Sequence, residues 1–126
     1  MKGPIHIADA EWEVMTVVWE RGPVAASVVA DLLVERKRWT LATVRTLLRR
    51  LTNKGALEQR LEGKRFLYTA RVSREECVRH ESESFLERVL GRTPSVAILH
   101  LVRKADLSEK DIQELRRILR EKEKKP

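Results

Sequence analysis

Apolar residues in the first third of the chain recur at the three- and four-residue spacing of amphipathic helices. Over residues 9–20 this spacing predicts a helix with a buried stripe of four large side chains: Trp12, Met15, Val18 and Trp19. We expect Asp9 to be the N-cap of this helix and Gly22-Pro23 to end it. The negative charge of Glu11 lies in the first turn, where it stabilises the helix by interacting with the positive end of the helix dipole. A second helix is predicted over residues 25–36, with an apolar stripe formed by Val28, Val29, Leu32 and Leu33.

A third helix, predicted over residues 41–53, has the clearest division into two faces. Thr40 is a good N-cap before it, and Gly55 suits the left-handed residue that often follows a helix. One face is apolar and is expected to join the core: Val44, Leu47, Leu48 and Leu51. The other face carries only hydroxyl, amide and guanidinium groups, from Thr43, Thr46, Arg50 and Asn53 with Arg45 and Arg49 beside them.

After Gly55 the apolar period changes from that of a helix to that of a strand. Residues 57–61 and 66–70 flank a Gly-containing turn, which predicts a β-hairpin with Lys64 and Arg65 at its tip. Three helices followed by a basic hairpin form the winged variant of the helix-turn-helix. In that fold the third helix enters the DNA major groove and the hairpin contacts the adjacent backbone. Residues 1–72 are therefore predicted to form a winged helix-turn-helix DNA-binding domain.

Residues 73–126 are predicted to fold as three further helices. Their expected starts are a capping box at Ser73 and Glu76, the Thr93-Pro94 pair, and a second box at Ser108 and Asp111. The first runs to about Leu90, and its apolar positions are Val78, Phe85, Leu86, Val89 and Leu90. The second is apolar on nearly every side between Val96 and Val102 and is expected to be buried. The third has apolar positions at Ile112, Leu115, Ile118 and Leu119.

Three helices of this length cannot bury so much apolar surface alone. We therefore expect residues 73–126 to form a dimerisation domain, with packing onto the first domain as the alternative. A two-fold dimer also matches a palindromic DNA site with two half-sites. The predicted fold class is mainly α with a small β-hairpin: a winged helix-turn-helix domain and a three-helix C-terminal dimerisation domain.

The net charge of +7 is concentrated in the middle of the chain. Residues 36–71 carry eleven basic side chains against two acidic ones, and no acidic residue occurs between Glu35 and Glu58. An ordinary surface helix mixes both signs, because opposite charges one turn apart stabilise it. Arginine, threonine and asparagine without carboxylates are the residue types that bind phosphates and base edges. We interpret this basic segment as a surface that binds DNA. The alternative is a solvated basic surface without a partner.

Other features of the 126 residues narrow the function further. No apolar run could span a bilayer, and no signal-peptide pattern follows the N-terminal Met1-Lys2-Gly3-Pro4, so we expect a cytoplasmic protein. His6, His80 and His100 lack metal-ligand spacing, and the sequence contains no nucleophile–base pair or phosphate-binding glycine loop. No enzymatic activity and no cofactor are expected. We interpret His100 as a core or interface residue and Cys77 as a small packing residue.

Two stretches carry a resemblance to a known family. Residues 10–15 read Ala-Glu-Trp-Glu-Val-Met, and residues 43–51 read Thr-Val-Arg-Thr-Leu-Leu-Arg-Arg-Leu, followed by Lys54-Gly55. Phe66 to Tyr68 and Glu114-Leu115 add to the match. With these motifs the chain resembles the BlaI/MecI/CopY family of penicillinase repressors over essentially its whole length.

The resemblance implies a winged-helix domain, a helical dimerisation domain, and repression by binding a dyad-symmetric operator. Family targets are typically β-lactamase, penicillin-binding-protein or copper-homeostasis genes. The positions that match the family's recognition helix are Thr40, Thr43, Arg45, Thr46, Arg49 and Arg50.

The resemblance also bears on how the repressor is inactivated. In antibiotic-responsive members, a membrane sensor with a zinc-protease domain leads to cleavage of the repressor at an Asn-Phe bond. The aligned bond in this chain is His100–Leu101. The copper-responsive branch ends in a cysteine cluster, whereas this chain has only Cys77.

Two other hypotheses remain at this point. The winged helix could serve protein–protein contact or bind DNA without sequence preference, in which case selection from random duplexes would return no palindrome. A redox or ligand sensor would require Cys77 to be exposed and reactive.

Overall fold

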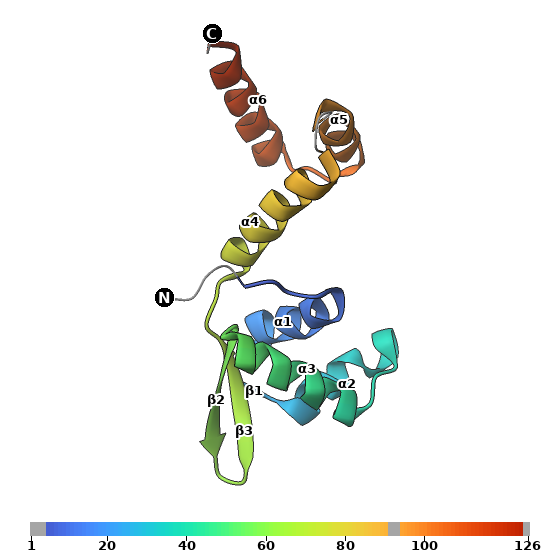
Figure 1. Cartoon of the computed structure of the whole chain (residues 1–126), viewed down its shortest axis with the longest axis vertical. Coiled ribbons are helices and arrows are strands. Elements are labelled where there is room, and N and C mark those ends of the chain that lie inside the picture. The colour runs from blue at the N-terminus through green and yellow to red at the C-terminus, as the bar shows by residue number, and fades with distance from the viewer. Residues whose placement is uncertain (1–4, 91–93, 125–126) are drawn as a thin grey trace. The chain divides into compact units, whose positions relative to one another are not determined.

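Three helices, a short strand and a hairpin make up most of the first of two units into which the chain divides. A computed structural model describes residues 5–90 and 94–124, and the two units are Met1–Phe85 and Leu86–Pro126. The elements of the first unit are α1 (Asp9–Arg21), β1 (Val24–Ala25), α2 (Ala26–Lys37), α3 (Leu41–Lys54), β2 (Leu57–Glu62), β3 (Arg65–Ala70) and α4 (Arg74–Phe85) (Figure 1). Those of the second are a π-helical turn, η1 (Leu86–Leu90), α5 (Pro94–Lys104) and α6 (Glu109–Lys124).

Local sequence signals place α3 as predicted. The Thr40 hydroxyl accepts a hydrogen bond from the Thr43 N–H at 3.2 Å, so Thr40 is the N-cap. Gly55 follows the helix with φ +88°, a left-handed conformation that suits a residue without a Cβ. The predicted cap of α1 was wrong by one residue, because Ala8 is the N-cap and Asp9 is the first helical residue.

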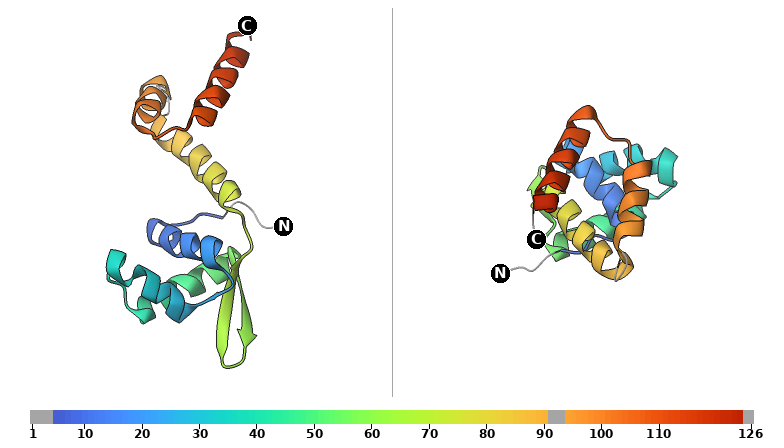
Figure 2. Two further views of the ribbon diagram at one scale, coloured as in Figure 1. Left: turned by 180° about the vertical axis from the view of Figure 1, so that it is seen from behind. Right: turned by 90° about the horizontal axis from the view of Figure 1, so that it is seen from above.

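The sheet has three antiparallel strands in the order β1-β3-β2. The predicted hairpin is present, with Leu61 opposite Phe66 and Gly63 at φ +66° in the turn. It extends away from the three helices in both side views (Figures 1 and 2). The strand β1 was not predicted: Val24 and Ala25 pair with Tyr68 and Leu67 of β3, and α2 begins one residue later than expected.

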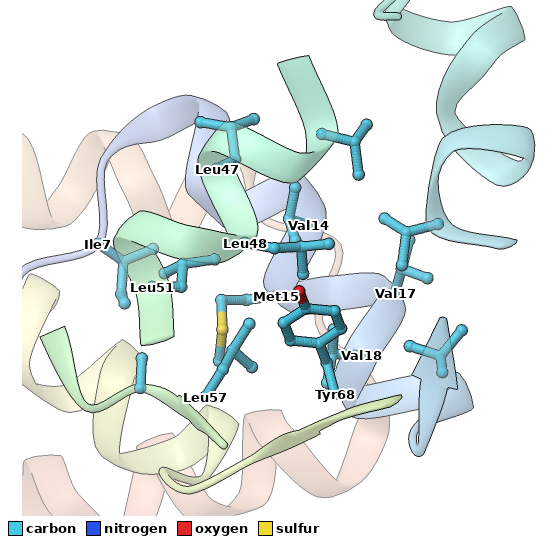
Figure 3. Packing of buried hydrophobic residues seen from close by; sticks show 14 of the residues in the cluster. Ile7, Val14, Met15, Val17, Val18, Leu47, Leu48, Leu51, Leu57 and Tyr68 are labelled. Carbon is cyan, nitrogen blue, oxygen red and sulfur yellow. The ribbon is translucent and has the colours of Figure 1, made fainter. Parts of the chain in front are cut away.

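The core of this unit lies between α1, α3 and the sheet (Figure 3). Met15 of α1, Leu48 of α3 and Leu57 of β2 are each 1% exposed or less. All four predicted core residues of α3 are buried. Predictions for the other two helices were partly wrong. Trp12 and Trp19 of α1 are half-buried against the core rather than inside it, and α2 buries Val29 and Leu33 while Val28 and Leu32 remain exposed.

The capping box that begins α4 is confirmed, since Glu76 N–H donates to the Ser73 hydroxyl and Ser73 N–H donates to the Glu76 carboxylate. The apolar positions predicted for this helix do not form a buried face in the single chain. Val78 is 48% exposed, and the side chain that α4 buries in the core is Cys77. The thiol therefore acts as the packing residue that its neighbours suggested.

The second unit has helices, but the side chains that the structure describes in it form no core. The box at Ser108 and Asp111 begins α6 as predicted, and α5 begins at Pro94, while Thr93 lies outside the described residues. Burial of 96–102 was predicted and is wrong for the single chain, in which Val96 is 71% exposed. No residue of this unit whose burial the structure describes is buried.

The two compact units do not by themselves define functional domains. By its contacts α4 groups with the first unit, whereas the division into a DNA-binding domain 1–72 and a dimerisation domain 73–126 stays a prediction. Within the described residues, no helix has the length and apolar character needed to cross a membrane.

Candidate nucleic-acid interface

The outward face of α3 is the first part of the candidate site. Because Val44, Leu47, Leu48 and Leu51 anchor one side of the helix in the core, the other side is held facing solvent. All six positions that sequence reasoning selected in and before this helix are exposed: Thr40, Thr43, Arg45, Thr46, Arg49 and Arg50. A rigid helix therefore presents hydroxyl and guanidinium groups on one surface.

Two threonines of this face bond within the helix. The Thr46 hydroxyl donates to the Ala42 carbonyl at 3.0 Å. The hydroxyls of Thr40 and Thr43 lie 3.2 Å apart and share one hydrogen bond. A threonine whose proton is used by its own backbone offers a partner a methyl group and an acceptor oxygen, but no donor. On a DNA base edge, the methyl group of threonine suits contact with the methyl group of thymine.

A cleft of about 400 Å³ separates α3 from the hairpin. Four basic side chains line it, Arg45 and Arg49 from α3 with Lys64 and Arg65 from the hairpin tip. The other lining residues are uncharged: Ala25, Ala26, Ser27, Thr52, Asn53, Gln59, Phe66 and Tyr68. The fold thus brings together cations that are up to twenty positions apart in the sequence, and the residues that line the cleft include no carboxylate.

Acidic residues of the first unit pair with cations that do not line this cleft. Glu13 lies 3.6 Å from Arg36, and Glu62 lies 3.3 Å from Arg60. Within the described part of the chain, the four cations of the cleft and Arg50 have no ion-pair partner. Cations without a protein partner are available to an external anion.

A partly buried ion pair fixes the C-terminal end of α3. The Glu11 carboxylate is 1% exposed, binds the Lys54 ammonium group, and accepts a hydrogen bond from Ala8 N–H at 2.9 Å. Lys54 also donates to the His6 carbonyl at 3.0 Å. Sequence reasoning assigned Glu11 only to the helix dipole. It missed this pair because the two residues are 43 positions apart and no local pattern joins them.

The structure also places residues that sequence reasoning did not select. Ser27, Gln59 and Phe66 line the cleft, and the strand period provides a signal for two of them, since Gln59 pairs with Tyr68 and Phe66 lies two residues before Tyr68 on the same face. His100 and Leu101 lie in α5 of the second unit and are exposed. His100 was predicted to be a core or interface residue, and of these two interpretations the core position is wrong for the single chain, while the interface position stays a prediction.

Cys77 does not fit a sensor. It is 4% exposed, and burial, together with the negative charges of Glu76 and Glu81, raises the pKa of its thiol. Reactive cysteines have lowered pKa values and partial exposure. The hypothesis of a redox sensor at Cys77 is therefore wrong. The described residues also contain no group of three or more His, Cys, Asp or Glu side chains able to hold a metal ion.

Comparison with known proteins agrees with this geometry. The sequence profile of the family described as "Penicillinase repressor" matches residues 7–121. The penicillinase repressor of Bacillus licheniformis is 36% identical over 121 residues, which cover 96% of this chain and 94% of that protein. The methicillin resistance regulatory protein MecI of Staphylococcus aureus (strain N315) is 34% identical over 117 residues, covering 93% and 95% respectively.

The fold has a solved counterpart as well. The Bacillus licheniformis BlaI monomeric form, determined in complex with the blaP half-operator, superimposes with a TM-score of 0.52 and 37% identity, covering 60% of this chain and 93% of that chain. The family that matches is one of transcriptional repressors and not of enzymes. The chain therefore belongs to the penicillinase repressor family, a family of winged-helix, DNA-binding transcriptional repressors.

Proposed function

We propose that this repressor binds a palindromic operator as a homodimer, with α3 of each protomer in the major groove and each hairpin on the adjacent backbone. The observation that carries the proposal is the exposed, carboxylate-free face of α3 beside a cleft lined by four cations. A helix of this kind suits the major groove, whose width admits an α-helix. Repression follows because a protein bound at an operator blocks transcription from it.

The residues divide by the kind of contact they suit. Thr43, Thr46 and Arg50 lie on the outer face of α3 and are proposed to face base edges, with Thr40 at the start of that helix. Arg45, Arg49, Lys64 and Arg65 line the cleft and are proposed to bind phosphates of one DNA strand. Phosphate contacts position the protein, and base contacts specify the sequence.

The second unit supports the dimer. Its described side chains form no buried core, although it exposes many large apolar residues: Leu86, Val89, Val96, Ile98, Leu99, Leu101, Val102, Ile112, Ile118 and Leu119. Monomeric proteins rarely expose so much contiguous apolar surface, whereas obligate dimers bury it between copies. That the related BlaI binds a half-operator as a monomer supports a full operator of two halves, each read by one protomer.

The relatives suggest what this repressor controls. By analogy with the penicillinase repressor and MecI, we propose that it acts in the cytoplasm on a gene of β-lactam resistance. Inactivation by a membrane sensor-protease pathway would act at the bond aligned with the family's cleavage site, His100–Leu101. Both residues are exposed but lie inside α5, so cleavage there requires that helix to unwind locally.

Binding selection tests the proposal. The full-length protein is incubated with a pool of random duplexes, and a palindromic consensus is the expected result. No consensus would show that the protein binds DNA without sequence preference or uses the winged helix for protein contact. Arg50→Ala is then expected to weaken binding to the selected site more than to random DNA, because Arg50 is assigned to bases. Equal losses on both DNAs would refute that assignment.

A further inference from the structure

Three side chains on one face of α4 hold this helix against the winged helix. Arg74, Cys77 and Glu81 are spaced by three and four residues, so they lie on the same side of the helix. The Arg74 guanidinium lies 5.3 Å from the ring centroid of Trp19, and Cys77 is buried in the core. Glu81 Oε1 lies 3.1 Å from His6 Nδ1 and 3.5 Å from the Ile7 backbone nitrogen. The Glu81 contact is the one farthest from the start of α4.

The segment that Glu81 contacts is itself fixed to the end of α3. The His6 carbonyl accepts a hydrogen bond from Lys54, the last residue of α3, and Ile7 is 1% exposed in the core. Residues 6–8 therefore form a bridge, with α3 on one side and α4 on the other. This bridge links α3, the helix proposed to read DNA, to α4. The last residue of α4, Phe85, is also the last residue of the first unit.

The position of this contact gives it control over the direction of α4. From Arg74 to Glu81 the helix rises by about 10 Å, so freeing its outer end lets it pivot on the two inner contacts. Cys77 is the one residue of α4 that is buried, among those whose burial the structure describes, so it is the inner point about which the helix can turn. Neither Glu81 nor His6 lines the cleft or lies on α3.

We propose that Glu81 and His6 are positioning residues, which set the direction of α4 relative to α3 and thereby the half-site spacing that the dimer accepts. The inference rests on the proposed function, because it requires a dimer that reads two half-sites. Removing the contact leaves each α3 able to read its own half-site. It weakens only the restraint on the distance between the two.

The test separates spacing from half-site binding. The sequence selected by the full-length wild type is rebuilt as a single half-site and as pairs whose centres are moved by about one or two base pairs in either direction. Glu81→Ala and His6→Ala remove the contact from its two sides. The matched control is Glu83→Ala, which removes the same charge from an exposed position of the same helix.

Both test variants are expected to keep the wild-type affinity for the single half-site. Their preference for the best spacing should fall by roughly two- to five-fold, the range that one partly exposed side-chain hydrogen bond supplies. Glu83→Ala should behave as the wild type does. The inference is overturned if Glu81→Ala keeps the full spacing preference, if Glu83→Ala loses as much, or if half-site affinity falls to the same extent. A wild type that selects no paired half-sites overturns the proposed dimer, and this inference with it.

Discussion

The number of cations in the cleft between α3 and the hairpin predicts how strongly DNA binding depends on salt concentration. Four cations line it, so a dimer with two such clefts would neutralise eight phosphates. Each neutralised phosphate contributes about −0.9 to the slope of log K against log salt, so eight give a slope of about −7. Between about 50 and 200 mM salt, this slope lowers the affinity on the order of 10⁴-fold.

Lys64→Ala removes one cation from each cleft. The slope should change by about 1.8, from about −7.2 to about −5.4, and the affinity lost over the same salt range should be roughly twelvefold smaller. Because a phosphate contact carries no sequence information, the variant should lose a similar factor on the operator and on random DNA. Fluorescence anisotropy of a labelled duplex, titrated at several KCl concentrations, measures both quantities.

Arg60→Ala is the matched control for this measurement. Arg60 lies on β2 of the same hairpin, but it follows Gln59 of the cleft and therefore points to the other face of the strand. Its guanidinium group is also paired with Glu62 at 3.3 Å. The slope of this variant should equal that of the wild type. An unchanged slope for Lys64→Ala, or an equal change for Arg60→Ala, would show that DNA does not occupy the cleft.

Three further predictions concern the core, the base contacts and the dimer. Lys54→Met should destabilise the first unit by about 2–3 kcal/mol in urea denaturation, because it leaves the Glu11 carboxylate buried without its cation, and adding Glu11→Leu should restore most of the loss. Thr46→Ala should lower operator preference by about 0.8 kcal/mol, roughly fourfold, whereas Thr46→Val keeps the methyl group and should retain that preference in competition binding. Leu119→Asp should shift the dimer to monomer in native mass spectrometry, since Leu119 is 51% exposed in the single chain.

Each of these predictions has a result that would contradict it. A double variant of Glu11 and Lys54 no more stable than Lys54→Met would show that the unpaired carboxylate is not the cause of the loss. Equal operator preference for Thr46→Val and Thr46→Ala would remove the role of the methyl group. For the dimer, Gln113→Asp adds the same charge on the polar side of α6, so an equal shift to monomer would point to charge rather than to a lost apolar contact.

The parts of the fold that the sequence predicted correctly are those whose local signals agree with the tertiary structure. Around α3, Thr40 and Gly55 fix both ends, and the apolar period coincides with the face that meets α1 and β2. The hairpin is a similar case, because Gly63 in its turn and alternating strands on either side determine its register. The four cations of the cleft could be predicted as DNA-binding residues for the same reason, because they lie on α3 and on the hairpin, whose positions local signals determine.

What the sequence did not predict depends on contacts between distant residues. Val24 and Ala25 form a strand only because β3 offers them a partner more than forty residues away. The apolar stripe of α2 was predicted too wide, because α2 meets the core along the line of Val29 and Leu33, and Val28 and Leu32 fall beside that line. The bridge from Lys54 through His6 to Glu81 joins three segments, and no local period contains it.

In the second unit, the positions of the helices were predicted correctly from the sequence, but the burial of their side chains in the single chain was not. Its helices were predicted from signals that lie within a few residues, such as the box at Ser108 and Asp111, and these signals act whether or not a core is present. Burial of Val96 to Val102 was predicted from hydrophobicity alone, and in the single chain these residues face solvent. A solvated protein does not keep such a surface uncovered without cost, because each buried methylene contributes about 0.8 kcal/mol. The exposure of these residues in the single chain therefore supports the proposal that a second copy covers these helices.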